Sequence, residues 1–214
     1  MKVGVLISGR GSNLASLIKA CAQPGFPAEI VTVISNNPGA KGLEIADAAG
    51  IPARVINHRD FAVRDTFDAC LSEALDDAGA EFICSAGFMR ILTDGFVEKW
   101  RNRQVNIHPS LLPAFKGLHV HARALEAGVR ITGATVHFVR PEMDEGPIVA
   151  QAAVPVMLND TEETLAARVL EAEHKLYPLA LRLIAEGRVR IVDEKVIISP
   201  APVDVPPSLI VPGV

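Results

Sequence analysis

The N-terminal half of the chain alternates between two hydrophobic periods, and this alternation restricts the folds that it can adopt. Short apolar or β-branched runs predict strands, and stretches with apolar residues at helical spacing separate them. The predicted strands are residues 3–7, 30–34, around 55–56, 82–84 and 105–107, and the predicted helices are residues 12–21, 41–48, 61–78 and 93–100. Because the strands are continuously apolar and no hairpin turn joins them, we expect a parallel, twisted α/β sheet with helices on both faces.

The second half of the chain has different patterning. It predicts an antiparallel pair of strands at 131–139 and 146–154, a long helix at 161–186 and a small hairpin at 188–198. The fold class is therefore α/β, an open, mainly parallel, Rossmann-like sheet with antiparallel late strands. We expect one domain over residues 1–199 and a Pro-rich tail over residues 200–214.

Composition excludes several classes of protein. Of the 214 residues, 49% are hydrophobic, which is too many for a disordered chain, yet no apolar run approaches the ~20 residues of a membrane span. With 21 Lys+Arg against 25 Asp+Glu, the chain offers no basic field for nucleic acid. Cys21, Cys70 and Cys84 form no CxxC pair. They predict buried, reduced thiols in a cytoplasmic protein.

A glycine-rich segment, Ser8-Gly-Arg-Gly-Ser-Asn13, joins the first predicted strand to the first predicted helix. Glycines let the backbone approach an anion, and the free N–H groups of a helix start attract it. A dinucleotide fingerprint is disfavoured because its third glycine would fall on Leu14, and the Lys of a Walker A loop is missing. The segment predicts a site for a single phosphate monoester, and the alternative is a tight, well-capped turn.

Asn106-Ile-His-Pro-Ser110 lies at the carboxyl end of a predicted interior strand, where open α/β sheets hold their ligands. Asn106 and His108 are two residues apart, so their side chains leave an extended strand on the same side. An amide donor beside an imidazole suits a developing oxyanion together with a proton transfer. Alternatively, the histidine caps a loop. Asp144 or Glu145, in the later turn, could orient the imidazole, although a turn favours such residues anyway.

Gly87-Phe-Met-Arg-Ile-Leu92 follows the fourth predicted strand and combines apolar side chains with one cation. A flat aromatic ligand would suit this wall. A packed loop between a strand and a helix is the plain alternative.

The remaining histidines do not predict a metal site. His119 and His121 open a helical segment, and no Cys or carboxylate lies at a matching ligand spacing. His137, on an alternating strand, is interpreted as a structural or binding histidine. His58 is expected to face solvent.

Together the motifs resemble the phosphoribosylglycinamide formyltransferases (glycinamide ribonucleotide transformylases) of purine biosynthesis. The matching segments run in order from Met1 to about Glu186: Ile7-Ser-Gly-Arg-Gly-Ser-Asn-Leu14, Ala86-Gly-Phe-Met-Arg-Ile-Leu92, Asn106-Ile-His-Pro-Ser-Leu-Leu-Pro113, Gly117-Leu-His-Val-His121, Gly133-Ala-Thr-Val-His-Phe-Val139, Asp144-Glu-Gly-Pro147 and Glu173-His174. Each motif is ambiguous alone, but their joint order and spacing are specific.

The resemblance implies formyl transfer from 10-formyltetrahydrofolate, as co-substrate, to the amine of N1-(5-phosphoribosyl)glycinamide, without a metal. The implied catalytic residues are Asn106, His108 and Asp144. The implied ribonucleotide-binding residues are Gly11, Ser12, Asn13 and Glu173. The implied 10-formyltetrahydrofolate-binding residues are Arg64, Met89, Arg90, Ile91, Leu92, Asn106, Arg140, Pro141, Glu142, Met143 and Asp144. The family pattern also implies a cis peptide bond between Leu112 and Pro113.

Other functions fit the sequence less well. A formyltetrahydrofolate hydrolase shares the Asn, His and Asp, but it carries a further regulatory domain and lacks the phosphate-holding loop. A methionyl-tRNA formyltransferase would bring a basic C-terminal domain. A non-catalytic nucleotide-sensing module has no use for the three polar residues. The expected partners are small-molecule substrates, with neither nucleic acid nor membrane, and the chain is expected to be a monomer or a homodimer.

Overall fold

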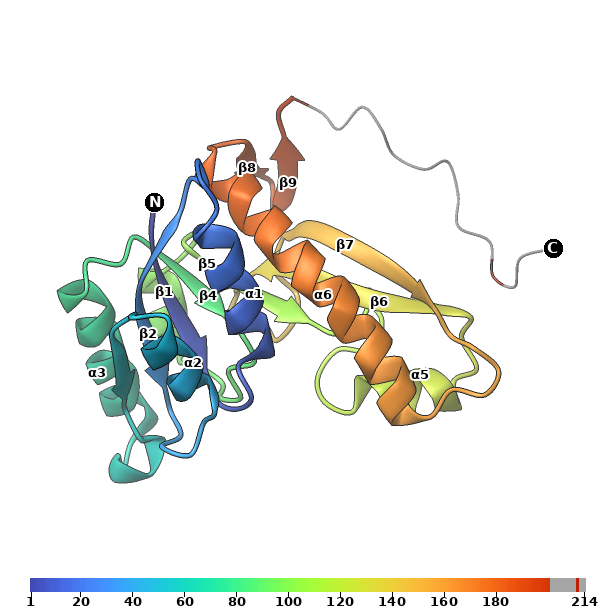
Figure 1. Cartoon of the computed structure of the whole chain (residues 1–214), viewed down its shortest axis with the longest axis horizontal. Coiled ribbons are helices and arrows are strands. Elements are labelled where there is room, and N and C mark those ends of the chain that lie inside the picture. The colour runs from blue at the N-terminus through green and yellow to red at the C-terminus, as the bar shows by residue number, and fades with distance from the viewer. Residues whose placement is uncertain (201–210, 212–214) are drawn as a thin grey trace.

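The computed structural model describes residues 1–200 and Val211, and Figure 1 shows the arrangement of its elements. The strands are β1 (Lys2–Ile7), β2 (Glu29–Ser35), β3 (Ala53–Val55), β4 (Phe82–Ser85), β5 (Gln104–His108), β6 (Ile131–Phe138), β7 (Ile148–Pro155), β8 (Val189–Val192) and β9 (Lys195–Ile198). The α-helices are α1 (Ser12–Cys21), α2 (Gly42–Ala48), α3 (Arg64–Asp77), α4 (Asp94–Lys99), α5 (Val120–Glu126) and α6 (Glu162–Ala185), and a 3-10 helix, η1, spans His58–Asp60. None of the described helices is both long and apolar enough to cross a membrane.

Seven strands form one sheet in the order β3-β2-β1-β4-β5-β6-β7, and β8 and β9 form a separate hairpin. The first five strands are parallel, whereas β6 and β7 pair antiparallel. The predicted α/β class with antiparallel late strands is confirmed. Because the chain turns back from β3 to β4, the loops that leave β1 and β4 flank a switch in strand order, where sheets of this kind bind ligands.

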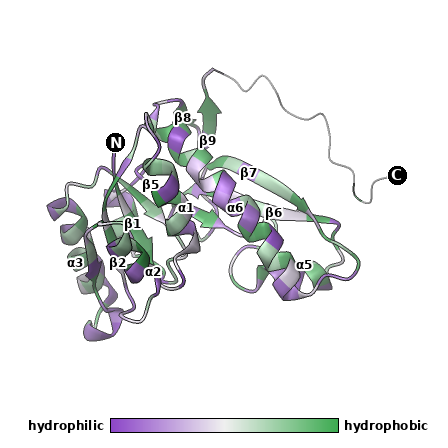
Figure 2. Ribbon diagram, in the orientation of Figure 1, coloured by the Kyte–Doolittle hydropathy of each residue, from purple (hydrophilic) through white to green (hydrophobic). Residues whose placement is uncertain are grey.

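Two apolar clusters cover the two faces of the sheet. Val3, Val5 and Ile7 of β1 belong to the first cluster, which α1, α2, α5 and α6 complete. Leu6 points to the second cluster, which contains Phe67, Leu71 and Leu75 of α3 and Phe96 of α4. In Figure 2 the strands are largely hydrophobic, and the helices on either side of the sheet carry hydrophilic residues on their outer faces. The alternation along β1 explains why its sequence is continuously apolar.

Two local features differ from the sequence prediction. β3 was expected to be covered, but all three of its residues are exposed at the edge of the sheet. The helix predicted from residue 61 begins at Arg64, because Phe61, which ends the 3-10 helix η1, and Val63 are both extended. The predicted tail, residues 200–214, lies outside the described residues except for Pro200 and Val211.

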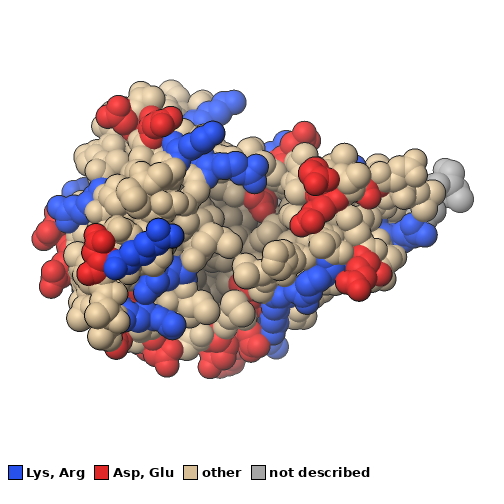
Figure 3. All heavy atoms as spheres, turned by 90° about the horizontal axis from the view of Figure 1, so that it is seen from below, with Lys and Arg blue, Asp and Glu red and all other residues tan. Residues whose placement is uncertain are grey.

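The second face of the sheet is covered differently over β5 and β6. Val105 and Ile107 of β5 point to the first cluster, so Asn106 and His108 point to the opposite face. There Phe115 of loop 109–119 and Asp144 of loop 140–147 contact the imidazole of His108. Seen from the carboxyl ends of the parallel strands, the surface is hollowed near its middle, with Lys and Arg gathered over the N-terminal half (Figure 3).

Candidate active site

Four polar side chains share one patch of the sheet. Asn106 and His108 on β5 lie opposite His137 and Thr135 on β6 in the antiparallel register. Cross-strand partners of this kind place their Cβ atoms about 4.5–5.5 Å apart on the same face. The Nδ2 atom of Asn106 lies 3.5 Å from Nε2 of His137. The register therefore gathers an amide and two imidazoles at one place.

His108 is held between two segments of loop. Its Nε2 lies 3.0 Å from the carbonyl oxygen of Phe115, which can only accept a hydrogen bond, so Nε2 carries a proton. Its Nδ1 lies 3.5 Å from Oδ2 of Asp144, and the same Oδ2 accepts a hydrogen bond from the Gly117 amide at 2.8 Å. The His108 and Asp144 side chains are only 7% and 9% exposed. The structure thus brings the predicted His108 and Asp144 together.

The loop behind His108 is fixed by the hydroxyl of Thr135. This hydroxyl donates to the carbonyl oxygen of Ser110 at 2.7 Å, accepts from the amide of Leu112 at 3.1 Å and accepts from Nε2 of Gln151 at 3.0 Å. Thr135 is fully buried, so these bonds are shielded from water. The predicted cis peptide bond between Leu112 and Pro113 is confirmed. These contacts hold the segment that carries Phe115 and so the imidazole.

His137 is closer to this centre than its sequence context indicated. Its Nδ1 lies 2.9 Å from the Phe138 carbonyl oxygen, and its Nε2 lies 3.7 Å from Oδ1 of Asp144. Burial lowers the pKa of His137, and the Phe138 bond and the Asp144 charge oppose this only in part. From its place on an alternating strand, His137 is predicted only to be a structural or binding histidine. Its place beside Asn106 follows from the antiparallel register of β5 and β6, which hydrophobic periodicity does not fix.

The glycine-rich segment begins α1 as expected. Gly11 is the N-cap residue and has a left-handed φ of 76°, and a Cβ there would lie 2.5 Å from Cα of Gly42. Ser12 is the first residue of the helix, and Nδ2 of Asn13 donates to Oε2 of Glu173 at 2.7 Å. Burial raises the pKa of Glu173, while the Asn13 bond acts against this rise. The four predicted ribonucleotide-binding residues are therefore joined across α1 and α6.

The predicted apolar wall is exposed at the site. Met89 and Ile91 of this wall are 67% and 59% exposed, and Met143 of the later turn is 57% exposed. The amide of Met89 donates to the Ser8 hydroxyl at 2.7 Å, so the loops after β1 and β4 are tied together. Exposed apolar side chains on a fixed loop can cover a flat ligand.

The other predicted cofactor-binding side chains differ in orientation. The Arg90 guanidinium lies over the Phe67 ring at 4.9 Å, and Leu92 packs against the second cluster. Arg64 is exposed at the start of α3. Pro141 is half-buried and Glu142 exposed, in the turn that leads to Asp144.

The side chain of Arg140 points away from the loop that leads to Asp144. Its side chain is 5% exposed and donates to Oε2 of Glu194 at 2.6 Å, to Oδ1 of Asn102 at 2.8 Å and to the Val139 carbonyl oxygen at 3.0 Å. Glu194 lies between β8 and β9, so this cluster links the hairpin to the start of the segment that carries Asp144.

The arrangement combines a hydrogen-bond donor, an imidazole and a buried carboxylate within one group of contacts. Such a group can stabilise a developing oxyanion and move a proton. Within residues 1–200 and Val211, no cluster of three or more His, Cys, Asp or Glu side chains could hold a metal ion.

Comparisons with known proteins agree on one family. A model of the formyl transferase family matches residues 1–181. The trifunctional purine biosynthetic protein adenosine-3 of Gallus gallus is 53% identical over 191 residues, 89% of this chain, and the chain spans only 19% of that protein. Phosphoribosylglycinamide formyltransferase of Haemophilus influenzae is 43% identical over 90% of this chain and 91% of its own length. The crystal structure of glycinamide ribonucleotide transformylase 1 from Symbiobacterium toebii aligns with a TM-score of 0.91 and 46% identity, covering 92% of this chain and 93% of that one.

Proposed function

The chain belongs to the formyl transferase family, and on this premise we propose that it transfers the formyl group of 10-formyltetrahydrofolate to the amine of N1-(5-phosphoribosyl)glycinamide. The products are formylglycinamide ribonucleotide and tetrahydrofolate, in purine biosynthesis. Residues 1–199 act as one formyltransferase domain. The observation that carries the proposal is the contact of His108 with Asp144 beside Asn106, at the carboxyl end of β5.

The reaction needs charge stabilisation and one proton transfer. The amine nitrogen attacks the formyl carbon, and negative charge develops on the formyl oxygen. Because the Phe115 carbonyl occupies Nε2 of His108, Nδ1–H of the imidazolium donates to that oxygen, together with Nδ2–H of Asn106. Asp144 holds the imidazolium by charge and orientation.

The collapse of the tetrahedral species completes the transfer. The bond from the formyl carbon to N10 of the folate breaks, and the carbonyl double bond forms again. The attacking nitrogen loses one proton and N10 gains one. Asp144 relays this proton through water. The proposed reaction forms no covalent intermediate with the enzyme and uses no metal.

The ribonucleotide binds at the start of α1. The Gly11 backbone and the N–H groups of Ser12 and Asn13 hold the phosphate end, since a helix start attracts an anion. Glu173, buried beside Asn13, binds polar groups of the same substrate.

The folate lies on the other side of the reacting centre. Met89, Ile91 and Leu92, with Arg90, flank its pterin, and Arg64 lies near its glutamate tail. The segment from Pro141 through Glu142 and Met143 to Asp144 closes over the pterin. Arg140 contributes through its backbone, because its side chain is bound to Glu194 and Asn102.

The fate of a labelled formyl group tests the proposal. The protein is incubated with 10-[¹³C]formyltetrahydrofolate, with and without N1-(5-phosphoribosyl)glycinamide, and the products are identified by NMR. We expect the label on the ribonucleotide amine only when both substrates are present. Release of the label as formate with water as acceptor would indicate a hydrolase, and unchanged substrates would indicate a sensing module. Either outcome overturns the proposal.

A further inference from the structure

The orientation of the Asn106 side chain decides whether it can donate to an oxyanion. A primary amide has an N–H₂ end that donates and an oxygen end that accepts, and the two ends have nearly the same shape. Packing alone therefore does not choose between them. In the proposed reaction only the N–H₂ end is useful, so a neighbour must select it.

His137 has the chemistry to make this choice. Its ring is 3% exposed, and its Nδ1 lies 2.9 Å from the Phe138 carbonyl oxygen. A carbonyl oxygen only accepts, so Nδ1 must carry a proton. The tautomer of a histidine follows from such a bond at its other nitrogen. In the neutral ring, Nε2 is then an acceptor without a proton.

The neutral ring is also the form that its surroundings favour. Burial lowers the pKa of His137, and the nearby His108 acts in the same direction. The Phe138 bond and the charge of Asp144 act in the opposite direction, but each has a smaller influence on the pKa than burial has. Oδ1 of Asp144 lies 3.7 Å from Nε2, which is beyond a direct hydrogen bond. The unprotonated Nε2 is therefore available to accept a hydrogen bond from Asn106.

We infer that His137 is a positioning residue for the transfer: its unprotonated Nε2 accepts a hydrogen bond from Nδ2 of Asn106 and so keeps the N–H₂ end of that amide in the active site. The two atoms are 3.5 Å apart, and the two residues are direct partners across β5 and β6. The opposite orientation would place Oδ1 of Asn106 against the lone pair of Nε2. One N–H of Asn106 is bound to His137, and the second is free to donate to the formyl oxygen.

The inference rests on the proposed function and predicts a specific pattern of kinetics. His137→Phe fills the space of the ring but offers no acceptor, whereas the oxygen of His137→Gln can take the place of Nε2. We expect His137→Phe to lower kcat by roughly 10- to 100-fold, part of the 10²–10³-fold that loss of an oxyanion donor costs. His137→Gln should recover most of this loss, and both KM values should change little.

A double-mutant cycle separates positioning from a general structural role. In an Asn106→Ala background His137 has no amide left to orient, so His137→Phe should lower kcat by less than about twofold further. A loss as large as in the wild-type background would overturn the inference, as would equal losses for His137→Phe and His137→Gln. Thermal unfolding of all the variants confirms that each one is folded.

A spectroscopic measurement tests the same inference without catalysis. In ¹⁵N-histidine-labelled protein at pH 7, we expect His137 to show a protonated Nδ1 and an unprotonated Nε2. A protonated Nε2 would contradict the inference even if formyl transfer occurs. Conversely, absence of formyl transfer with the expected tautomer would count against the proposed function alone.

Discussion

Nδ1 of His108 lies 3.5 Å from Oδ2 of Asp144, and both side chains are more than nine-tenths buried. The carbonyl oxygen of Phe115 binds Nε2 of the same ring. Only Nδ1 is therefore left to donate a hydrogen bond, and it faces Asp144 and the active site. A carboxylate and an imidazole that are buried together interact more strongly than an exposed pair, because water screens them less.

Gly11 supports the ribonucleotide site through its backbone. Its left-handed φ of 76° is strained for an L side chain, and a Cβ would lie 2.5 Å from Cα of Gly42. We expect Gly11→Ala to raise the KM for the ribonucleotide by roughly tenfold or more, about 1.4 kcal/mol of binding, with little change in the KM for the folate. Gly9→Ala is the matched control, because its Cβ would meet nothing within 4 Å. Equal rises in both KM values for Gly11→Ala would mean that the loop is only structural.

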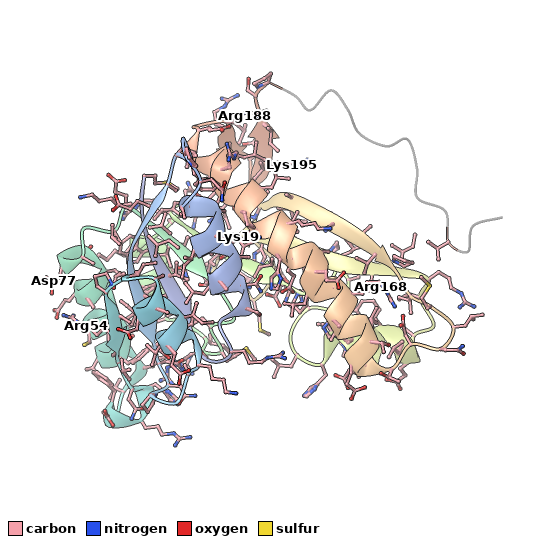
Figure 4. The ribbon with its side chains drawn as sticks, viewed as in Figure 1. Lys19, Arg54, Asp77, Arg168, Arg188 and Lys195 are labelled. Carbon is pink, nitrogen blue, oxygen red and sulfur yellow. The ribbon has the colours of Figure 1, made fainter. Side chains whose placement is uncertain are left out.

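Asp160 and Arg168 join the end of β7 to the start of α6, and Figure 4 labels Arg168 on that helix. The two hydrogen bonds from the guanidinium, at 2.7 and 2.8 Å, are the main reason why the pKa of Asp160 is lowered. A lowered folded-state pKa means that the stabilisation is complete above the ordinary aspartate pKa of about 3.9 and is lost as the pH falls through the folded value. Asp160→Asn should lower the melting temperature at pH 7, and this difference should shrink below about pH 4. A difference that stays constant from pH 7 to pH 2 would contradict this assignment.

Glu194 holds Arg140 and also accepts a hydrogen bond from Arg101 at 3.0 Å. Glu194→Ala leaves the buried Arg140 guanidinium with carbonyl partners only, and the start of the turn that carries Asp144 is then less firmly held. We expect the KM for the folate to rise roughly 3- to 10-fold, about 0.7–1.4 kcal/mol, while the KM for the ribonucleotide is unchanged. Glu98→Ala removes the other carboxylate partner of Arg101 and leaves Arg140 untouched, so it should alter neither KM. The same change in both variants would exclude a role for the Arg140 contact.

Cys21 and Cys84 are expected to be unreactive. Burial raises the pKa of Cys21 to about 11 and that of the fully buried Cys84 higher still, so neither forms the reactive thiolate at neutral pH. Activity should survive both a thiol reductant and dialysis against a metal chelator. Loss of activity after dialysis against the chelator, restored by a divalent metal, would show that a step of the reaction needs a metal.

Local patterns allowed much of the fold to be predicted, and long-range partners account for most of the remainder. The apolar run Val3–Ile7 was sufficient to predict a strand covered on both faces. Near residue 55 similar residues gave the same expectation, yet β3 is an exposed edge, because strand order is a property of the whole sheet. His58 was expected to face solvent, but it is half-buried, with Nδ1 bound to the Asn36 carbonyl oxygen at 2.9 Å.

In the candidate site, too, local patterns predict some of the contacts and long-range packing determines the others. Asn106 and His108 could be paired from their spacing alone, since two residues of a strand at i and i+2 share a face. No local signal places Glu194 against Arg140, because the two are distant in sequence and the contact depends on where the hairpin packs. His137 could be assigned to Asn106 only from the register of β5 and β6, which hydrophobic periodicity does not fix.

The central claim is that Asp144 acts on the transition state through His108. Asp144→Asn keeps the shape of the side chain but removes its charge. Single-turnover formyl transfer with both substrates saturating should slow by roughly 10²–10⁴-fold, the range of general acid–base catalysis, with much smaller changes in substrate binding. His108→Ala should be comparably slow, and the double variant should be little slower than either single variant because the two residues act as one unit. Asp144→Asn protein that is folded by circular dichroism and transfers formyl at a near-normal rate would contradict this account.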